Sequence, residues 1–355
     1  MTAYLIKRIL TFIPLLFVIA SLSYCIIGLS AVNPAERMAS GAENQDNYQA
    51  QISYWEQKFN LNQPIYYFEI KTLSEDENSI GAYIPSIKWN GLDNRFHYWL
   101  KNIFLKADFG HSYHDGSDIK SIIFQKLPLS LAIGFASLLL SFLIAIPIGI
   151  AFCQSKNQKK LAFLNFPLII IQALPSFLIA SILILLLANP QFIKILPSGG
   201  FGKIYLNENF FEKLKYLILP ILSLSIPLIP YLVWMVEKNI QNQLQSEFIK
   251  TAKAKGLSEN QILYKHALKN AILPLITIFS GALPGIFGGS VIIETLFNLP
   301  GMGLELFKAI VNTDYPMIQT VFLLIAFTTL LSWFLADIFY FKADPRIKIS
   351  KQNNW

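Results

Sequence analysis

Residues 129–152 read LSLAIGFASLLLSFLIAIPIGIAF, a mostly apolar run without a charged side chain. A helix needs about 20 such residues to cross the hydrocarbon core of a membrane, so this run is long enough for one crossing. The composition of the whole chain agrees, because its 355 residues are 54% hydrophobic and 14% charged, whereas soluble domains carry about 25% charged residues. The sequence therefore predicts an all-α membrane protein.

Six stretches of the chain are long and apolar enough to span a membrane. They are residues 9–29, 129–152, 161–188, 216–236, 271–297 and 317–341. Several contain proline, which membrane helices tolerate where neighbouring helices or water satisfy the freed carbonyl groups. In the fifth stretch, Gly281 and Gly285 stand four residues apart. This spacing lets two helices approach closely and is equally compatible with a bend in one helix.

The basic residues predict the orientation of these helices. The formal net charge is +7, but the lysines and arginines are spread over several connections, so they favour a membrane protein over one that binds nucleic acid. Basic residues are enriched in cytoplasmic loops. The most basic segments precede the first stretch, join the second to the third and the fourth to the fifth, and follow the sixth. The sequence therefore predicts six transmembrane helices with both termini in the cytoplasm.

This topology divides the chain into four parts. We expect residues 1–30 to form an N-terminal transmembrane helix, because its apolar run exceeds the roughly 7–15 residues of a signal peptide. Residues 31–126 are expected to form a long extracytoplasmic loop that folds as a small helical cap. Residues 127–341 would form a core of five transmembrane helices that includes a cytoplasmic loop at 237–270, and residues 342–355 a cytoplasmic tail.

Motifs for catalysis are missing from this sequence. It contains no nucleophile elbow, no phosphate-binding P-loop and no helical His-Glu-x-x-His motif. His111, His114 and Asp115 are metal-binding residue types, but their Gly/Ser/Asp-rich surroundings favour a polar turn, and we assign no metal site. Glu294 and Asp337 are charged groups near the ends of predicted spans, where they are candidates for function or for interfacial structure. We predict a chain without catalytic residues or a cofactor of its own.

The cytoplasmic loop at 237–270 contains the most informative local pattern. Residues 245–255 suit a helix, and Gly256 suits the position after a helix end where φ is positive. Ser258 and Gln261 have the spacing of a capping box that starts the next helix. The sequence predicts a short helix, a fixed corner and a rigid helix that leads into the membrane. Such an element is suited to transmit a push from a cytoplasmic partner, or to lie as a basic amphipathic helix on anionic lipid.

The same loop carries a family resemblance. Its sequence EFIKTAKAKGLS at 247–258, followed by HALKNAILP at 266–274, resembles the EAA loop of ABC-importer permeases, and more narrowly that of the dipeptide, oligopeptide and nickel permease family. Lys250-Thr251-Ala252 stands where the general motif has Glu-Ala-Ala. Matching segments follow in order along nearly the whole chain: YLIKRIL at 4–10, IP at 13–14, DFGHS at 108–112, KLPLS at 126–130, LPSF at 174–177, GG at 288–289, ETLFNLPGMG at 294–303, DYP at 314–316 and DPRI at 344–347. The chain departs from the shortest members by extra sequence around 72–91.

The resemblance implies a type I ABC-importer permease in the bacterial inner membrane, forming half of a pathway for dipeptides or oligopeptides. The implied partners are a second homologous permease, two cytoplasmic ATPase subunits that bind ATP and Mg, an extracytoplasmic substrate-binding protein and the lipid bilayer. The residues that would couple to an ATPase subunit are Glu247, Phe248, Lys250, Thr251, Ala252, Lys253, Ala254, Lys255, Gly256 and Ser258.

Other functions compete with this interpretation. A permease for nickel or another small solute belongs to the same family, but His, Met and Cys are scarce in the predicted spans. An ion-coupled carrier would show inverted repeats and a charged site at the membrane midplane, and neither is evident; a membrane scaffold is a further alternative. The candidate residues of the pathway are polar or helix-breaking: Gln172, Pro175, Ser176, Ser280, Pro284 and Glu294. The polar ones are equally suited to bond a neighbouring helix.

Overall fold

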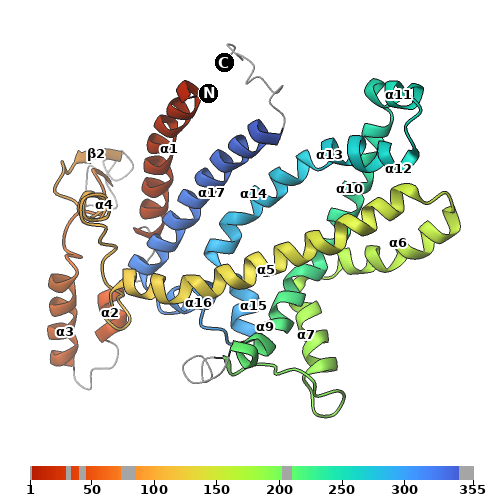
Figure 1. The fold of residues 1–355 in the computed structure, drawn as a ribbon. Coiled ribbons are helices and arrows are strands. Elements are labelled where there is room, and N and C mark those ends of the chain that lie inside the picture. The colour runs from red at the N-terminus through yellow and green to blue at the C-terminus, as the bar shows by residue number, and fades with distance from the viewer. Residues whose placement is uncertain (1, 29–32, 40–44, 73–84, 202–209, 344–355) are drawn as a thin grey trace. The chain divides into compact units, whose positions relative to one another are not determined.

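The computed structural model describes residues 2–28, 33–39, 45–72, 85–201 and 210–343. The described chain is mainly helical (Figure 1). Its helices are α1 (Thr2–Gly28), α2 (Pro34–Ala39), α3 (Gln45–Lys58), α4 (Arg95–Lys106), α5 (Ile119–Gln154), α6 (Gln158–Ala173), α7 (Ser176–Leu187), α9 (Phe210–Ser225), the 3-10 turn η2 (Ile226–Leu228), α10 (Ile229–Leu244), α11 (Glu247–Ala254), α12 (Glu259–Gln261), the π-helix η3 (Ile262–Ala267), α13 (Leu268–Ala271), α14 (Leu273–Gly288), α15 (Val291–Leu296), α16 (Met302–Val311) and α17 (Tyr315–Ala343). Two strands, β1 (Phe68–Thr72) and β2 (Pro85–Trp89), complete the described elements.

Among the described residues, five helical segments are long and apolar enough to cross a membrane. They are Ile6–Gly28, Ile119–Gln154, Glu212–Leu244, Glu259–Gly288 and Tyr315–Lys342. A sixth crossing results if the pair α6 and α7 counts as one span, although the two helices are bent by 106° at the break between them. The break coincides with Leu174-Pro175 because proline lacks the N–H that would continue the helix.

The fifth predicted stretch, 271–297, differs from the observed helix. The apolar segment begins at Glu259 and ends at Gly288, so its limits lie earlier in the chain than expected. Gly289 has φ 72°, a left-handed conformation that ends a helix. The residues that follow form the separate short helix α15.

The prediction of an all-α chain is wrong for one short region. β1 and β2 pair antiparallel, with Phe68 opposite Trp89 and Ile70 opposite Ile87. The sequences FEIKT and PSIKW alternate apolar and polar residues, which is the period of a strand. The extra sequence noted around 72–91 therefore supplies β2, while residues 73–84 lie outside the described part of the chain.

The chain divides into two compact units. Unit 1 comprises residues 1–125 and 306–326, and unit 2 comprises residues 126–305 and 327–355. In unit 1, fully buried Phe96 lies in an aromatic cluster, with its ring centroid 5.2 Å from that of Tyr24 and 5.1 Å from that of Tyr66.

Unit 2 is held together by close helix crossings at glycine. A Cβ added at Gly149 of α5 would lie 2.7 Å from Cβ of Val236 in α10, and one at Gly134 would lie 2.7 Å from the side chain of Ile286 in α14. Small residues allow such close packing between membrane helices. The long helix α5 therefore packs against both α10 and α14.

Candidate coupling helix and buried carboxylate

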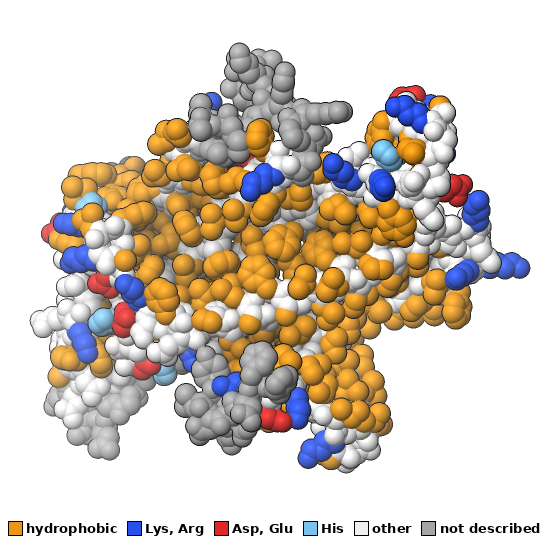
Figure 2. Space-filling view, in the orientation of Figure 1, with side chains coloured by type: hydrophobic (Ala, Val, Ile, Leu, Met, Phe, Trp, Pro, Cys, Tyr) orange, Lys and Arg blue, Asp and Glu red, His pale blue; other side chains and the backbone are white. Residues whose placement is uncertain are grey.

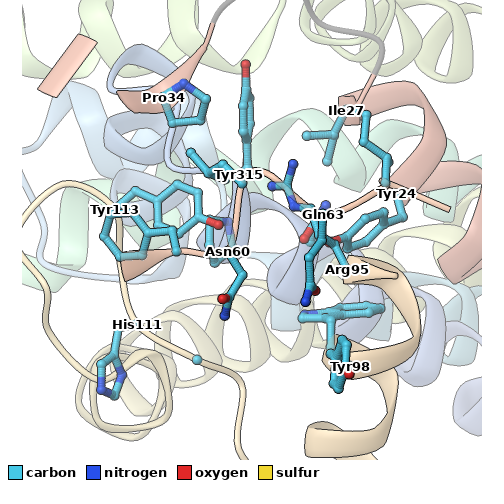
Figure 3. Close-up of a pocket in the computed structure, with 18 of the residues that line it drawn as sticks. Tyr24, Ile27, Pro34, Asn60, Gln63, Arg95, Tyr98, His111, Tyr113 and Tyr315 are labelled. Carbon is cyan, nitrogen blue, oxygen red and sulfur yellow. The ribbon is translucent and has the colours of Figure 1, made fainter. Parts of the chain in front are cut away.

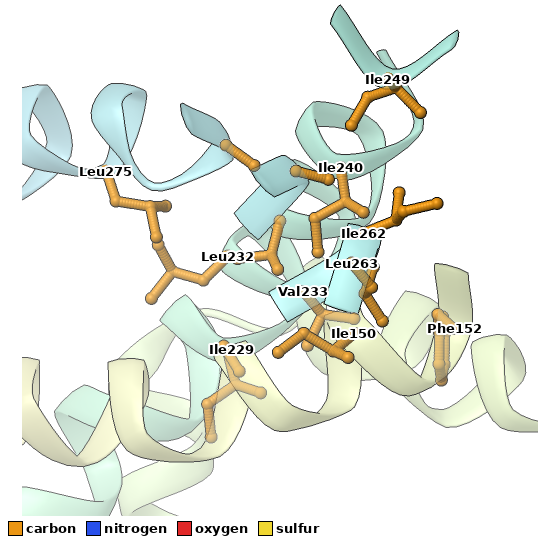
Figure 4. Close-up of a cluster of buried hydrophobic side chains, with 14 of the residues drawn as sticks. Ile150, Phe152, Ile229, Leu232, Val233, Ile240, Ile249, Ile262, Leu263 and Leu275 are labelled. Carbon is orange, nitrogen blue, oxygen red and sulfur yellow. The ribbon is translucent and has the colours of Figure 1, made fainter. Parts of the chain in front are cut away.

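Helix α11 is short and amphipathic. Ile249 and Ala252, three residues apart on one face, are buried at 0% and 6% exposure. They belong to a hydrophobic cluster that also contains Ile240 of α10, Ile262 of η3 and Phe152 of α5 (Figure 4). Residues three apart lie on the same side of a helix, so one face of α11 packs on the core of unit 2. The opposite face is exposed.

A fixed corner joins α11 to α12. Gly256 has φ 78°, as the helix-end pattern predicts. The backbone N–H of Gln261 donates to the Ser258 hydroxyl at 3.4 Å, and the backbone N–H of Ser258 donates to Oε1 of Gln261 at 3.2 Å. The predicted capping box is therefore confirmed. We call Gly256–Ser258 the α11–α12 corner.

The segment after this corner is not the uniform rigid helix that the sequence predicts. Ile262–Ala267 form a π-helix, followed by α13 and by a turn at Ile272 before α14. A π-helix is rare and is often found at functional sites. Ile262, Leu263 and Ala267 are nevertheless buried in the same cluster as Ile249. The corner and the π-helix therefore share one core with α11.

The predicted coupling residues fall into two groups. Ala252 is buried against the chain's own core and is not available to a partner. The others are exposed, among them Phe248, an aromatic residue with 40% of its surface accessible. Lys250 Nζ lies 2.7 Å from Oε1 of Glu247, but both side chains are largely exposed, and such pairs contribute little to stability. The exposed group is Glu247, Phe248, Lys250, Thr251, Lys253, Ala254, Lys255, Gly256 and Ser258.

Glu294 is a second site in unit 2, and its carboxylate is buried at 2% exposure. Oε1 accepts hydrogen bonds from the Ser130 hydroxyl at 2.8 Å and from the backbone N–H of Ser290 at 3.2 Å. Oε2 accepts from the backbone N–H groups of Gly303 at 2.7 Å and Leu304 at 3.1 Å. Four hydrogen-bond donors therefore surround the carboxylate. The carboxylate thus satisfies N–H groups in the first turn of α16, which otherwise lack partners.

Ser130 completes this arrangement from a distant part of the sequence. Its hydroxyl donates to Glu294 and accepts from the backbone N–H of Met302 at 2.8 Å. Sequence reasoning noted Ser130 only within KLPLS, because nothing local indicates its partner. Three glycines let the backbone close around the carboxylate: a Cβ at Gly289, Gly301 or Gly303 would come closer than 3.0 Å to neighbouring atoms. We call residues 288–304 the Glu294 turn.

The structure separates the predicted pathway residues. Gln172 and Pro175 are exposed at the α6–α7 break, and Ser176 is partly buried. The Ser280 hydroxyl is buried and has no hydrogen-bond partner among the described residues. Only Glu294 of the six is among the residues lining a cavity of about 350 Å³ in unit 2. This cavity brings Glu294 together with Ser130, Ser137 and Ser290.

The predicted polar turn at His111, His114 and Asp115 lies in unit 1. Asp115 accepts from the backbone N–H of Ser117 at 3.0 Å and from its hydroxyl. The Ser117 hydroxyl lowers the pKa of Asp115. Within the described ranges, no group of three His, Cys, Asp or Glu side chains has the arrangement of a metal site. We call residues 108–118 the DFGHS turn.

Asp314 holds this turn against the start of α17. It is buried and accepts from the Ser112 hydroxyl and from the backbone N–H of Tyr113 at 3.0 Å. Burial raises the pKa of Asp314, although these donors oppose the shift. The motifs DFGHS and DYP, far apart in the sequence, are therefore partners in one contact.

Comparisons with known proteins identify a transport family and several permeases that are similar to this chain. A family model described as a binding-protein-dependent transport system inner membrane component matches residues 145–349. The oligopeptide transport system permease protein AppB of Bacillus subtilis (strain 168) is 31% identical over 349 residues, covering 98% of this chain and all of that protein. The peptidoglycan transport system permease protein YejB of Agrobacterium fabrum (strain C58 / ATCC 33970) is 27% identical over 370 residues, with 99% and 100% coverage. The nickel import system permease protein NikB of Staphylococcus aureus (strain bovine RF122 / ET3-1) is 26% identical, with 98% and 93% coverage.

Proposed function

We propose that this chain, which belongs to the family of binding-protein-dependent transport system inner membrane components, is the permease subunit of an ATP-driven importer of peptides. Family membership and the apolar helices place it in the bacterial inner membrane as a multi-pass protein. The observation that carries the proposal is α11, a short helix with one face on the core of unit 2 and the other exposed. It leads through a capped corner into the membrane helix α14.

The proposed topology has six crossings, with α6 and α7 as one broken span. Both termini and α11 would lie in the cytoplasm, and residues 31–126 outside. Support comes from two basic groups in unit 2. Lys156, Lys159 and Lys160 follow α5, and the lysines of α11 adjoin the same hydrophobic cluster as Phe152 at the end of α5. Figure 2 shows Lys side chains at this end of unit 2, in agreement with an excess of basic residues on the cytoplasmic face.

In this proposal, two cytoplasmic ATPase subunits bind ATP and Mg, and one of them receives α11. The exposed ring of Phe248 would enter an apolar groove, and the surrounding lysines would meet acidic or carbonyl groups at its rim. Movement of the ATPase subunits would then displace α11, and the corner would pass this displacement to α14. This chain itself supplies no catalytic group in the scheme.

The remaining proposed partners are a second homologous permease and an extracytoplasmic binding protein. Gly281 and Gly285 give support for the former. A Cβ built at either glycine would meet nothing within 4 Å, and both are exposed on α14. Since no helix that the structure describes occupies that surface, we propose that a helix of the second permease packs there.

Peptide is the proposed cargo because relatives that match the whole chain are named for oligopeptide and peptidoglycan transport. Nickel is the second candidate, because one relative is named for nickel import. Uptake of labelled peptide and of Ni²⁺ by vesicles with the assembled transporter separates the two. ATP-dependent uptake of peptide is expected, and uptake of Ni²⁺ alone would contradict the proposed cargo.

The coupling role is tested by Gly256→Val. Valine is strained at φ 78°, so the corner should distort while the buried core remains intact. We expect the variant to remain in the membrane and to hydrolyse ATP with its partners, but to import several-fold less cargo for each ATP.

Gly116→Val is the matched control, because Gly116 also has a positive φ of 72° and open space around it. It lies in the DFGHS turn, away from α11 in the sequence. Normal coupling in Gly256→Val, or an equal loss in both variants, would refute the role of the corner.

A further inference from the structure

Unit 1 contains a cavity of about 570 Å³. None of the sequence motifs discussed above gives this cavity a function. Side chains from α1, α3, α4, the DFGHS turn and the start of α17 line it. Tyr24, Gln63, Arg95 and Tyr315 lie around its centre (Figure 3). Pockets for small molecules commonly have volumes of about 300–1,000 Å³, so this cavity has room for a short peptide.

Two cationic side chains, Lys58 and Arg95, line this cavity, and Arg95 is the one near its centre. Its guanidinium lies near the phenols of Tyr24 and Tyr113 and interacts with them electrostatically. It forms no ion pair with any residue that the structure describes. A guanidinium has five N–H donors in a planar fork, which is more than two neighbouring phenols can occupy. An unpaired guanidinium in a partly enclosed site is suited to a bidentate carboxylate.

The backbone at Arg95 is fixed before any ligand binds. Asn94 is fully buried, and its side chain accepts from the N–H of His97 at 2.9 Å and donates to the carbonyl of Gly91 at 2.8 Å. The N–H of Arg95 donates to the carbonyl of Pro64 at 2.9 Å. Phe96, the next residue, is fully buried in the aromatic cluster. Preorganisation of this kind reduces the cost of binding.

The rest of the lining matches a peptide better than a metal ion. Two carboxylates, Glu56 and Asp108, line the cavity as well. A zwitterionic peptide has a carboxylate for Arg95, an ammonium group for one of these acids and amide groups for amide side chains. Asn60, Gln63 and Asn102 provide such amides. A bare cation would be repelled by the guanidinium.

We infer that this cavity is a binding site on the permease itself for the carboxylate end of a short zwitterionic peptide, with Arg95 as its anchor. The inference rests on the proposed function, because Arg95 and most of the cavity lining belong to the segment that the proposed topology puts outside the membrane.

The test measures peptide binding to the full chain in lipid nanodiscs, with alanyl-alanine and its C-terminal amide as probes. Trp99 lines the cavity and provides a fluorescence signal. A charge-assisted hydrogen bond supports an expected preference of about tenfold or more for the free acid. Arg95→Gln should remove this preference. Arg95→Lys should keep part of it, because lysine has the charge without the fork.

Lys101→Gln is the matched control, since it removes one positive charge from the same helix at an exposed position outside the cavity lining. It should bind both probes as the unaltered chain does. Equal affinity of the unaltered chain for acid and amide, absence of saturable binding, or an equal loss in Lys101→Gln would overturn the inference.

A separate measurement distinguishes this inference from the proposed function. Uptake of alanyl-alanine by the assembled transporter tests the function, whereas the acid–amide difference tests the site without ATPase subunits. If the transporter takes up alanyl-alanine but the chain binds the free acid and the amide with equal affinity, the proposed binding site is refuted and the proposed function is not. If Arg95→Gln weakens docking of the binding protein while the unaltered chain binds both probes alike, the occupant is an acidic group of that protein and the inference is wrong.

Discussion

The α11–α12 corner and the Glu294 turn use the same local elements in different surroundings. Each has a glycine with positive φ, 78° at Gly256 and 72° at Gly289, followed by a serine that caps a short helix. A Cβ at Gly256 would meet nothing within 4 Å, whereas one at Gly289 would lie 2.5 Å from the backbone nitrogen of Gly303. The local pattern therefore forms a corner in both places, but only the Glu294 turn also depends on distant atoms.

Among the proposed variants, Glu294→Ala should lower the stability of the protein most, because the Glu294 turn depends on distant atoms. It would leave four donors without the carboxylate, and each buried unsatisfied group costs about 1–3 kcal/mol. We expect a loss of about 4 kcal/mol or more in the free energy of unfolding, measured by thermal unfolding in detergent together with the amount of protein in the membrane.

Glu247→Ala is the control for that variant, because it removes an exposed glutamate with an exposed lysine partner. Its expected cost is below about 1 kcal/mol. Similar unfolding temperatures for the two variants would show that the Glu294 carboxylate does not hold the turn.

The two glycines provide the next comparison. Gly256→Ala should cost about 1–2 kcal/mol, the penalty of a left-handed conformation for an L-residue with no clash. Gly289→Ala adds contacts of 2.5 Å with the nitrogen of Gly303 and 2.6 Å with Oε1 of Glu294. We expect a total of about 3 kcal/mol or more there. Thermal unfolding of both variants under the same conditions measures the difference, and equal costs would contradict the role of space at Gly289.

The sequence could predict the α11–α12 corner but not the bonds of the Glu294 turn. Gly256 and the capping box at Ser258 are local signals, because all their partners lie within a few residues. Glu294 depends on Ser130, which is 164 residues away, and no periodicity reports such a pair. The family motif indicated that Glu294 matters without indicating its donors.

Other differences from the prediction have similar physical causes. The π-helix at Ile262–Ala267 changes the helical period over only a few residues, which is too short a stretch for apolar spacing to reveal. β1 and β2 are short, and their pairing across residues 73–84 is a non-local contact. Arg95 was missed because the role proposed for it depends on the cavity around it. Its only local signal is a lone arginine beside Phe96, Tyr98 and Trp99.

Ser258→Ala tests the exposed corner with a smaller effect. It removes the hydroxyl that accepts from the N–H of Gln261 at 3.4 Å. Loss of a helix N-cap costs about 1 kcal/mol, and solvent can replace the acceptor at this exposed position. We expect a lower ratio of cargo to ATP with little change in unfolding temperature, measured in reconstituted vesicles. A large loss of stability would indicate that the corner is a structural element like the Glu294 turn.

The smallest expected effect concerns two carboxylates of unit 1, buried Asp314 and exposed Asp115, and the dependence of stability on pH. Because burial raises the pKa of Asp314, the folded state binds a proton more readily than the unfolded state. Between the unfolded and the raised folded pKa, stability from this group therefore increases as pH falls. The pKa of Asp115 is lowered, so its contribution is present above its unfolded pKa and lost only as pH falls through the lower folded pKa.

Unfolding temperatures of the unaltered chain and of Asp314→Asn, compared from about pH 7 to about pH 4.5, measure this effect. The difference should shift in favour of the unaltered chain on acidification. Parallel curves would show that Asp314 does not change its protonation more readily in the folded state.

The π-helix between the corner and α14 has a consequence for the timing of movement. The unusual π-type hydrogen bonds are confined to the six residues Ile262–Ala267. The neighbouring helix α14 has α-helical bonds over 16 residues and packs on α5. The amides of Ile262–Ala267 should accordingly exchange with deuterium sooner than those of α14, and stimulation of the cycle should widen this difference.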